Sequence, residues 1–237
     1  MIRGSGLPAF RVVGSMAVLF YPLVILMGQF HGAVLYSVSL VMGFAALAMA
    51  KIPIEQKPIR SAAVTAFGVI YLGGLLGFGI PIREGWIMFE PEGVSTTDRA
   101  TWTMFFLLPV VVTWVADTAA YFGGRRYGKQ KLAPQVSPKK TVVGVIFGLI
   151  AAVIAAVVYS RLLLSEVWVF GWLTTVAFGL TVGVFAILGD LVESALKREC
   201  GVKNSSNLLP GHGGMLDRLD SVLWALPAAF FFMVLLK

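Results

Sequence analysis

Apolar segments of about 20 residues follow one another along this chain and leave little of it for anything else. We expect about seven of them, at 10–28, 32–50, 61–80, 101–122, 142–163, 168–189 and 216–236. A helix of about 20 residues spans the hydrocarbon core of a bilayer, and its backbone groups are all hydrogen-bonded within the segment. The pattern therefore predicts an all-α, polytopic integral membrane protein with about seven transmembrane helices.

The composition of the 237-residue chain agrees with this class. Hydrophobic residues make up 58% of it and charged residues 13%, whereas soluble domains are about half apolar and about a quarter charged. No separate soluble domain is expected in the remaining length. The N-terminus lacks a cleavable-signal pattern, which predicts an uncleaved first span. The single cysteine, Cys200, excludes an intramolecular disulfide.

Most basic residues fall in the connections on one side of the predicted spans. That side receives the N-terminus and two long polar connections, 123–141 and 190–215, and the opposite side receives few cations. The positive-inside rule therefore predicts a cytoplasmic N-terminus and two cytoplasmic polar loops. Because these loops account for the net charge of +7, we expect no nucleic-acid partner.

Several acids lie at the predicted cytoplasmic ends of spans, where an isolated carboxylate costs about 3 kcal/mol to insert. They are Asp117 in the fourth span, Asp190 and Glu193 after the sixth, and Asp217 and Asp220 in the seventh. Carboxylates at one membrane depth repel unless a cation lies among them, and oxygen ligands favour Mg²⁺, Mn²⁺ or Ca²⁺ over zinc. The alternative is structural, with Asp217 in a buried salt bridge to Arg218 or Lys197.

The loop after the fourth span combines glycines with cations, a composition that suits a polyphosphate. Gly128-Lys129 is similar to the end of a P-loop. However, Gln130 replaces the required Ser or Thr and no strand is expected before the loop, so we reject that interpretation. His212, which glycines flank, is a candidate to hydrogen-bond a phosphate or to assist a proton transfer.

Residues 115–221 resemble the phosphatidate cytidylyltransferases, also called CDP-diacylglycerol synthases. The C-terminal signature of that family is matched by Ser194, Lys197, Arg198, Lys203, Pro210, His212, Gly213, Gly214, Asp217, Arg218 and Asp220. A second marked region is matched by 117–122, 128–129 and 137–141. The chain departs from the family pattern at Val143, Asn204 and Ser206, where Glu, Asp and Gly are usual. It is also short for the family, and we expect it to lack N-terminal spans.

The resemblance implies transfer of the cytidylyl group of CTP to phosphatidic acid, giving CDP-diacylglycerol and pyrophosphate. It implies Mg²⁺, with two cation sites and a second ion of unknown identity. The implied metal ligands are Asp190 and Asp217, with Asp220, Asp117 and Glu193 as further candidates. The implied catalytic residues are Asp190, Asp217, Lys197, Arg198, His212 and Arg218. The implied substrate-binding residues are Lys129, Ser137, Lys139, Lys140, Lys203 and Ser194.

The motifs divide the chain into two parts. Residues 1–100, with the first three spans and an outer loop, match the family only in hydrophobicity, whereas 101–237 form the predicted catalytic region. The expected partners are CTP, phosphatidic acid, other membrane lipids and a second copy in a homodimer. The expected location is the inner (plasma) membrane of a prokaryote, with the active site facing the cytoplasm.

Three alternatives stay open. A CTP-dependent transferase acting on an ether lipid or a polyprenol would use the same residues, and Asn204 allows a degenerate homologue with weak activity. The third alternative is a cation transporter, for which acids near the middle of spans are expected. The acids of this chain are predicted at span ends beside basic loops, which favours chemistry on a soluble nucleotide.

Overall fold

The computed structural model of the chain describes residues 11–85, 99–165, 167–168, 170–202, 205, 214 and 216–236. Within these ranges six helices are long and apolar enough to cross a membrane, and Val12–Met27 is a shorter apolar helix. The described residues also contain one two-stranded sheet. The prediction of an all-α polytopic membrane protein with about seven spans is therefore confirmed.

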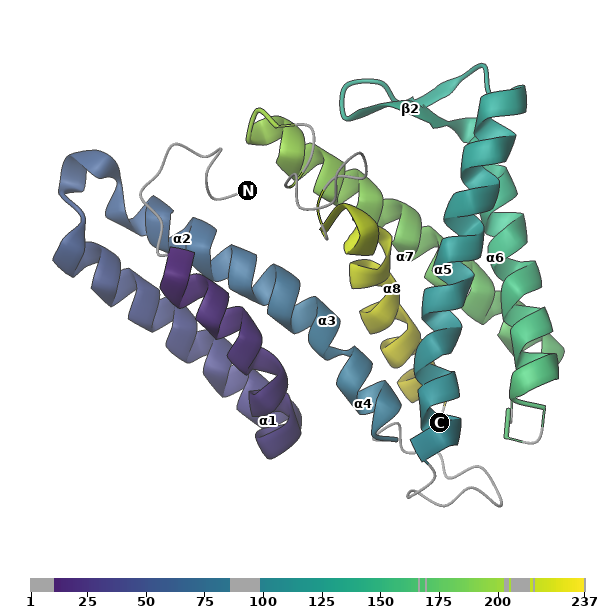
Figure 1. Cartoon of the computed structure of the whole chain (residues 1–237), viewed down its shortest axis with the longest axis horizontal. Helices are drawn as coiled ribbons and strands as arrows, with labels where there is room; N and C mark the ends of the chain where they lie inside the picture. The colour runs from purple at the N-terminus through teal and green to yellow at the C-terminus, as the bar shows by residue number, and fades with distance from the viewer. Residues whose placement is uncertain are drawn as a thin grey trace.

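Helix α1 (Arg11–Lys51) doubles back on itself as a helical hairpin (Figure 1). The Tyr21 hydroxyl lies 2.7 Å from Ser37 Oγ, although the two residues are 16 positions apart. A straight helix of that length would separate them by about 24 Å, so the chain must reverse between them. The sequence predicted this reversal between the spans 10–28 and 32–50.

The third span consists of short helical pieces that continue one another (Figure 1). The 3₁₀ turn η1 (Ile54–Gln56) precedes α2 (Pro58–Val69), the π-helical turn η2 (Ile70–Gly74), α3 (Leu75–Gly77) and α4 (Gly79–Arg83). A π turn places an extra residue in the helix and is often found at functional sites. With α1, this span buries a cluster made of Ala17, Tyr21, Ile25, Phe44, Ala48, Ala62, Ala66 and Val69.

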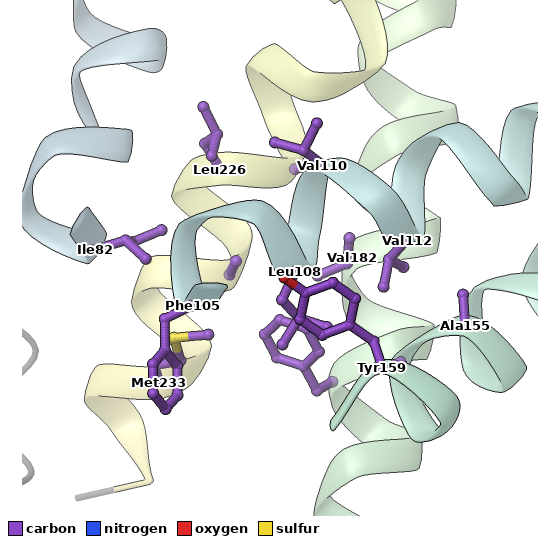
Figure 2. Packing of buried hydrophobic residues seen from close by; sticks show 14 of the residues in the cluster. Ile82, Phe105, Leu108, Val110, Val112, Ala155, Tyr159, Val182, Leu226 and Met233 are labelled. Atoms are coloured by element: carbon purple, nitrogen blue, oxygen red, sulfur yellow. The ribbon is translucent and has the colours of Figure 1, made fainter. Parts of the chain in front are cut away.

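The C-terminal part is a bundle of four long helices, α5 (Arg99–Tyr127), α6 (Val142–Leu163), α7 (Trp172–Glu199) and α8 (Leu216–Leu235). Figure 2 shows Phe105 and Leu108 of α5 and Met233 of α8 within the apolar core of the bundle. Ile82 of α4 enters the same core, so the end of the third span is anchored to the bundle.

A β-hairpin projects from the end of the bundle between α5 and α6 (Figure 1). Its strands, β1 (Lys131–Ala133) and β2 (Ser137–Thr141), pair antiparallel. Thr141 then caps α6, because its Oγ1 accepts a hydrogen bond from the Gly144 N–H at 3.1 Å. The sequence indicated a polar loop over 123–141 but not the hairpin within it, since short cationic strands lack the apolar alternation that identifies a half-buried strand.

Two predicted spans end too early. The fourth was expected to end at 122 and the sixth at 189, whereas α5 continues to Tyr127 and α7 to Glu199. Asp117 and Asp190 therefore lie inside helices and not at their ends. Hydropathy marks the point where residues become polar, but a helix with one polar face continues beyond that point.

Helices α7 and α8 approach each other closely at Gly189. A Cβ atom added there would lie 2.7 Å from the backbone oxygen of Asp220 and 3.0 Å from Trp224 Cβ. Because a backbone atom cannot move aside cheaply, we expect Gly189→Ala to destabilise the protein by about 1–3 kcal/mol. Thermal unfolding in detergent measures this effect. Gly68→Ala is the control, since nothing lies within 4 Å of the added atom, and an equal midpoint for both variants would contradict the close approach.

Candidate active site

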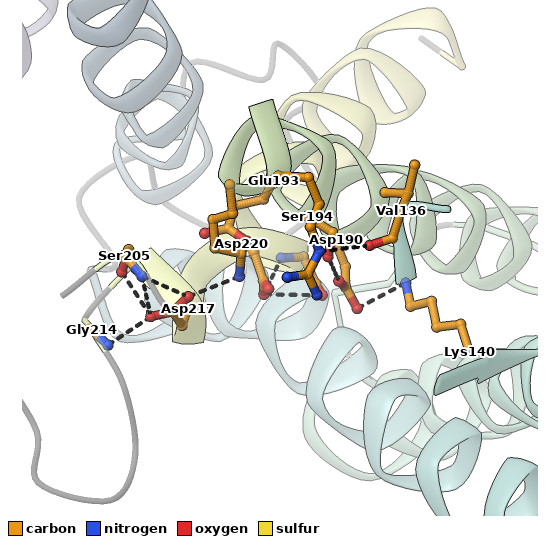
Figure 3. A network of polar contacts seen from close by, with 12 residues as sticks. Val136, Lys140, Asp190, Glu193, Ser194, Ser205, Gly214, Asp217 and Asp220 are labelled. Atoms are coloured by element: carbon orange, nitrogen blue, oxygen red, sulfur yellow. Dashed lines mark hydrogen bonds and ion pairs between the residues drawn. The ribbon is translucent and has the colours of Figure 1, made fainter. Parts of the chain in front are cut away.

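The acids singled out in the sequence gather near one end of the bundle, where α7 ends, α8 begins and the hairpin lies close by (Figures 1 and 3). They come from three helices: Asp117 from α5, Asp190 and Glu193 from α7, and Asp217 and Asp220 from α8. The fold thus brings together residues that are about 100 positions apart in the sequence. We call this group the acid cluster.

Lys197 connects two members of the acid cluster. Its Nζ lies 2.8 Å from Asp217 Oδ1 on α8, and it also forms an ion pair with Glu193, one turn earlier on α7. The Glu193 side chain is fully buried, and its Oε1 has no hydrogen-bond partner in the described part of the chain. Lys197 supplies the countercharge that such a carboxylate requires. The salt bridge considered for Asp217 therefore exists, with Lys197 as its partner.

Asp217 also holds the connection that precedes α8. Its Oδ2 accepts hydrogen bonds from the Ser205 N–H at 3.0 Å, the Ser205 hydroxyl at 2.8 Å and the Gly214 N–H at 2.7 Å (Figure 3). A carboxylate that accepts backbone N–H groups beside a helix start stabilises that start, as an N-cap does. Asp217 is therefore an anchor, and a metal ion would bind there only by replacing some of these donors. Ser205 was missed because a serine in a polar loop carries no distinctive signal.

A second group of contacts joins the hairpin to α7. Lys140 of β2 lies 2.8 Å from Asp190 Oδ2, and the Ser194 hydroxyl donates to Asp190 Oδ1 at 3.2 Å. Arg198 Nε donates to the Val136 backbone oxygen at 3.4 Å, which is a second link (Figure 3). Asp190, Glu193 and Ser194 are three or four positions apart on α7 and therefore share one of its faces.

Asp220 and Asp117 complete the acid cluster. Asp220 Oδ1 accepts the Ser221 N–H at 2.8 Å, and Asp117 lies beside Ser221. Both acids interact electrostatically with Asp190 and with each other. Among the described residues no three His, Cys, Asp or Glu side chains are already arranged to hold a metal ion. The donors are all carboxylate oxygens, which suits Mg²⁺, but Asp190 and Asp217 are each paired with a lysine.

Of the remaining predicted site residues, the structure describes four cations and one serine, and the others lie outside the described ranges. Lys129, Lys139, Arg198 and Arg218 are exposed to solvent, and Ser137 is half-buried on β2. His212, Lys203 and Asn204 fall outside the described residues. Exposed cations thus lie on the hairpin, at the end of α7 and at the start of α8. An anionic ligand that approaches the acid cluster from this end of the bundle meets positive charge first.

Comparison with known proteins identifies the family. The model of the cytidylyltransferase family matches residues 4–236. A phosphatidate cytidylyltransferase of Thermotoga maritima is 35% identical over 173 residues, covering 72% of this chain and 58% of that protein. One of Haemophilus influenzae is 45% identical over 139 residues, covering 56% and 47%. One of Synechocystis sp. is 32% identical over 195 residues, covering 77% and 65%.

The chain thus spans between 47% and 65% of the length of these relatives. The family match nevertheless extends over nearly all of it, from the first helix to the last. It therefore includes both the acid cluster and the first three spans, in which the sequence alone showed no motif. The chain belongs to the cytidylyltransferase family.

Proposed function

We propose that the chain transfers the cytidylyl group of CTP to phosphatidic acid, giving CDP-diacylglycerol and pyrophosphate. The observation that carries this proposal is the meeting of acids and lysines from β2, α7 and α8 at one end of the bundle (Figure 3). Asp117 of α5 interacts with the same group. The similar proteins named phosphatidate cytidylyltransferase support the choice of nucleotide and lipid. In the reaction, an oxygen of the lipid phosphate attacks the α-phosphorus of CTP, and the bond from that phosphorus to the β-phosphate oxygen breaks.

The first requirement of this reaction is to overcome repulsion between two anions. The lipid phosphate is already an oxyanion at pH 7, so the site needs positive charge more than it needs a strong base. Lys140 and Lys197 supply fixed charge at the acid cluster, with side chains only 21% and 13% exposed. Arg198, Lys139 and Lys129 would neutralise the triphosphate, and Lys203, His212 and Arg218 remain candidates for the same task.

Mg²⁺ is part of the proposal. Asp117, Asp190 and Asp220 would hold it, because they come from three helices, interact with one another and offer oxygen ligands alone. Asp217 and Glu193 would join as ligands if Lys197 moved to a substrate phosphate. When bound, the ion neutralises negative charge on the transferred phosphate. A second cation site, expected from the resemblance, belongs to the same proposal.

Purified protein in detergent, supplied with labelled CTP, phosphatidic acid and Mg²⁺, tests this function. We expect label in the lipid product, with a strict requirement for the nucleotide and the metal ion. Because the similar proteins are named for cytidylyl transfer, ATP should not replace CTP. Efficient turnover with ATP, or none with CTP, would reject the proposal.

We also propose that the active site faces the cytoplasm from the inner membrane of a prokaryote. In a Cys200→Ala background, single cysteines at Gln130 on the hairpin and at Glu92, which lies outside the described residues, should react from opposite faces of the membrane. Labelling of sealed vesicles with an impermeant thiol reagent measures this. Reaction of both cysteines from one face would contradict the topology. The homodimer expected from the sequence is also a proposal, and crosslinking of two copies through the same cysteines tests it.

A further inference from the structure

Beside the acid cluster lie two buried hydrogen-bond donors that meet no acceptor among the described residues. Tyr71, in the π turn η2, is only 5% exposed, and its hydroxyl has no hydrogen-bond partner in the described part of the chain. The indole N–H of Trp224 on α8 likewise has no partner there. The Trp224 indole N–H approaches the Tyr71 oxygen without reaching hydrogen-bond geometry, and both groups lie close to Glu193 and Asp220. Buried donors are seldom left unpaired in folded proteins, so this pair requires an explanation.

Both donors are held in place by close packing. The Phe67 ring stacks on Tyr71 with ring centroids 5.4 Å apart. The backbone of η2 is pressed onto α1, because a Cβ atom at Gly73 would lie 2.9 Å from Tyr21 Cβ. Trp224 packs against Gly189 of α7, where an added Cβ would lie 3.0 Å from its Cβ. Both side chains therefore project from closely packed backbone positions.

The Trp224 donor lies deeper in the bundle than the Asp220 carboxylate. Trp224 is one helical turn, about 6 Å, further along α8 than Asp220. The ribbons of α2 and α8 converge toward α4 and separate toward the end that carries the acid cluster (Figure 1). Tyr71 of η2 and Trp224 of α8 lie close to each other, so side chains of the third span and of the bundle meet here. In a diacyl lipid, the ester groups lie on the same deeper side of the phosphate, on the neighbouring glycerol carbons.

We propose that Tyr71 and Trp224 form a subsite that binds an ester carbonyl oxygen of the lipid substrate and thereby selects ester-linked over ether-linked chains. This subsite rests on the proposed function. An ester carbonyl offers a good acceptor to an O–H and an N–H donor. An ether-linked lipid has no carbonyl oxygen, and its bridging ether oxygen does not project from the chain toward the donors. Both donors would then lose the acceptor that fits them, which is the situation that sites use to reject an analogue.

The test compares two phosphatidic acids of equal chain length, one with ester and one with ether linkages, in the same detergent. We expect the unmodified protein to have a kcat/KM about tenfold higher for the ester lipid, as for the loss of about one hydrogen bond. Tyr71→Phe and Trp224→Phe should each lower kcat/KM for the ester lipid alone, and so bring the two lipids close together. Tyr36→Phe is the matched control, since its hydroxyl is bonded to the Ala17 carbonyl within α1 and the variant should keep the full preference.

Equal kcat/KM for both lipids in the unmodified protein would overturn the subsite and leave the proposed function intact. An equal loss for both lipids in Tyr71→Phe and Trp224→Phe would also overturn it, because that pattern indicates general damage to the fold. Turnover of neither lipid by folded protein would instead overturn the proposed function, and this subsite with it.

Discussion

Lys197→Gln should lower cytidylyl transfer by about a hundredfold or more and should also lower the thermal stability of the protein. The substitution leaves Glu193 and Asp217 as neighbouring carboxylates without their shared cation, and Glu193 is fully buried. Breaking a buried ion pair on one side costs about 3–5 kcal/mol. The same substitution removes a fixed positive charge from the place where two anions must react. Turnover and melting temperature, measured on one preparation, report the two effects.

Lys131→Gln is the matched control, because Lys131 is an exposed lysine on β1. This variant should have the same melting temperature as the unmodified protein. Lys197→Arg keeps the charge and should recover part of the stability, although a guanidinium does not fit every ammonium site. A Lys197→Gln protein with unchanged melting temperature and turnover would show that the bridge between Glu193 and Asp217 is not needed.

Asp190→Asn should lower turnover by about a hundredfold or more and change the melting temperature little. Asparagine keeps the shape of the side chain and can still accept the Ser194 hydroxyl. The lost ion pair with Lys140 is partly solvated, since the two side chains are 21% and 26% exposed, so its removal costs about 0–1 kcal/mol. The negative charge removed, however, is one that the proposed Mg²⁺ requires. The variant should therefore need a higher Mg²⁺ concentration for its residual activity.

Asp217→Asn provides the contrast. An amide in place of this carboxylate would set an N–H₂ group against Lys197, Ser205 or Gly214, all of which donate to it now. Stability and turnover should therefore fall together, whereas Asp190→Asn separates them. An Asp217→Asn protein that is as stable and as active as the unmodified one would exclude both an anchoring and a metal-binding role for this residue.

The membrane helices could be predicted because about 20 apolar residues in a row admit few other structures. The span 142–163 coincides with α6 to the residue. The π turn in the third span could not be predicted in the same way. It is packed against α1, where a Cβ atom at Gly73 would lie 2.9 Å from Tyr21 Cβ, and Gly77 of the following α3 approaches the Ile25 side chain. Such packing depends on tertiary contacts that hydropathy does not record.

The acids could be singled out as a group because each is costly in a membrane helix. Of their partners, only Lys197 for Asp217 was among those considered, since the others depend on how the helices are rotated and on how β2 meets α7. Lys140 reaches Asp190 only because the hairpin folds back, and the sequence offered no strand signal there. Tyr71 was missed for a related reason: one tyrosine in a glycine-rich span is unremarkable until the fold places it beside Glu193.

The most direct measurement follows the two ends of the nucleotide separately in the purified, folded protein. CTP labelled on the α-phosphate and CTP labelled on the γ-phosphate are each incubated with phosphatidic acid and Mg²⁺, and lipid and aqueous products are separated. If the ends of α5, α7 and α8 form one centre for cytidylyl transfer, the α label enters the lipid, the γ label leaves as pyrophosphate, and both signals are lost in Asp190→Asn. Transfer of the γ label to lipid, no transfer of either label, or equal transfer by Asp190→Asn would contradict that centre.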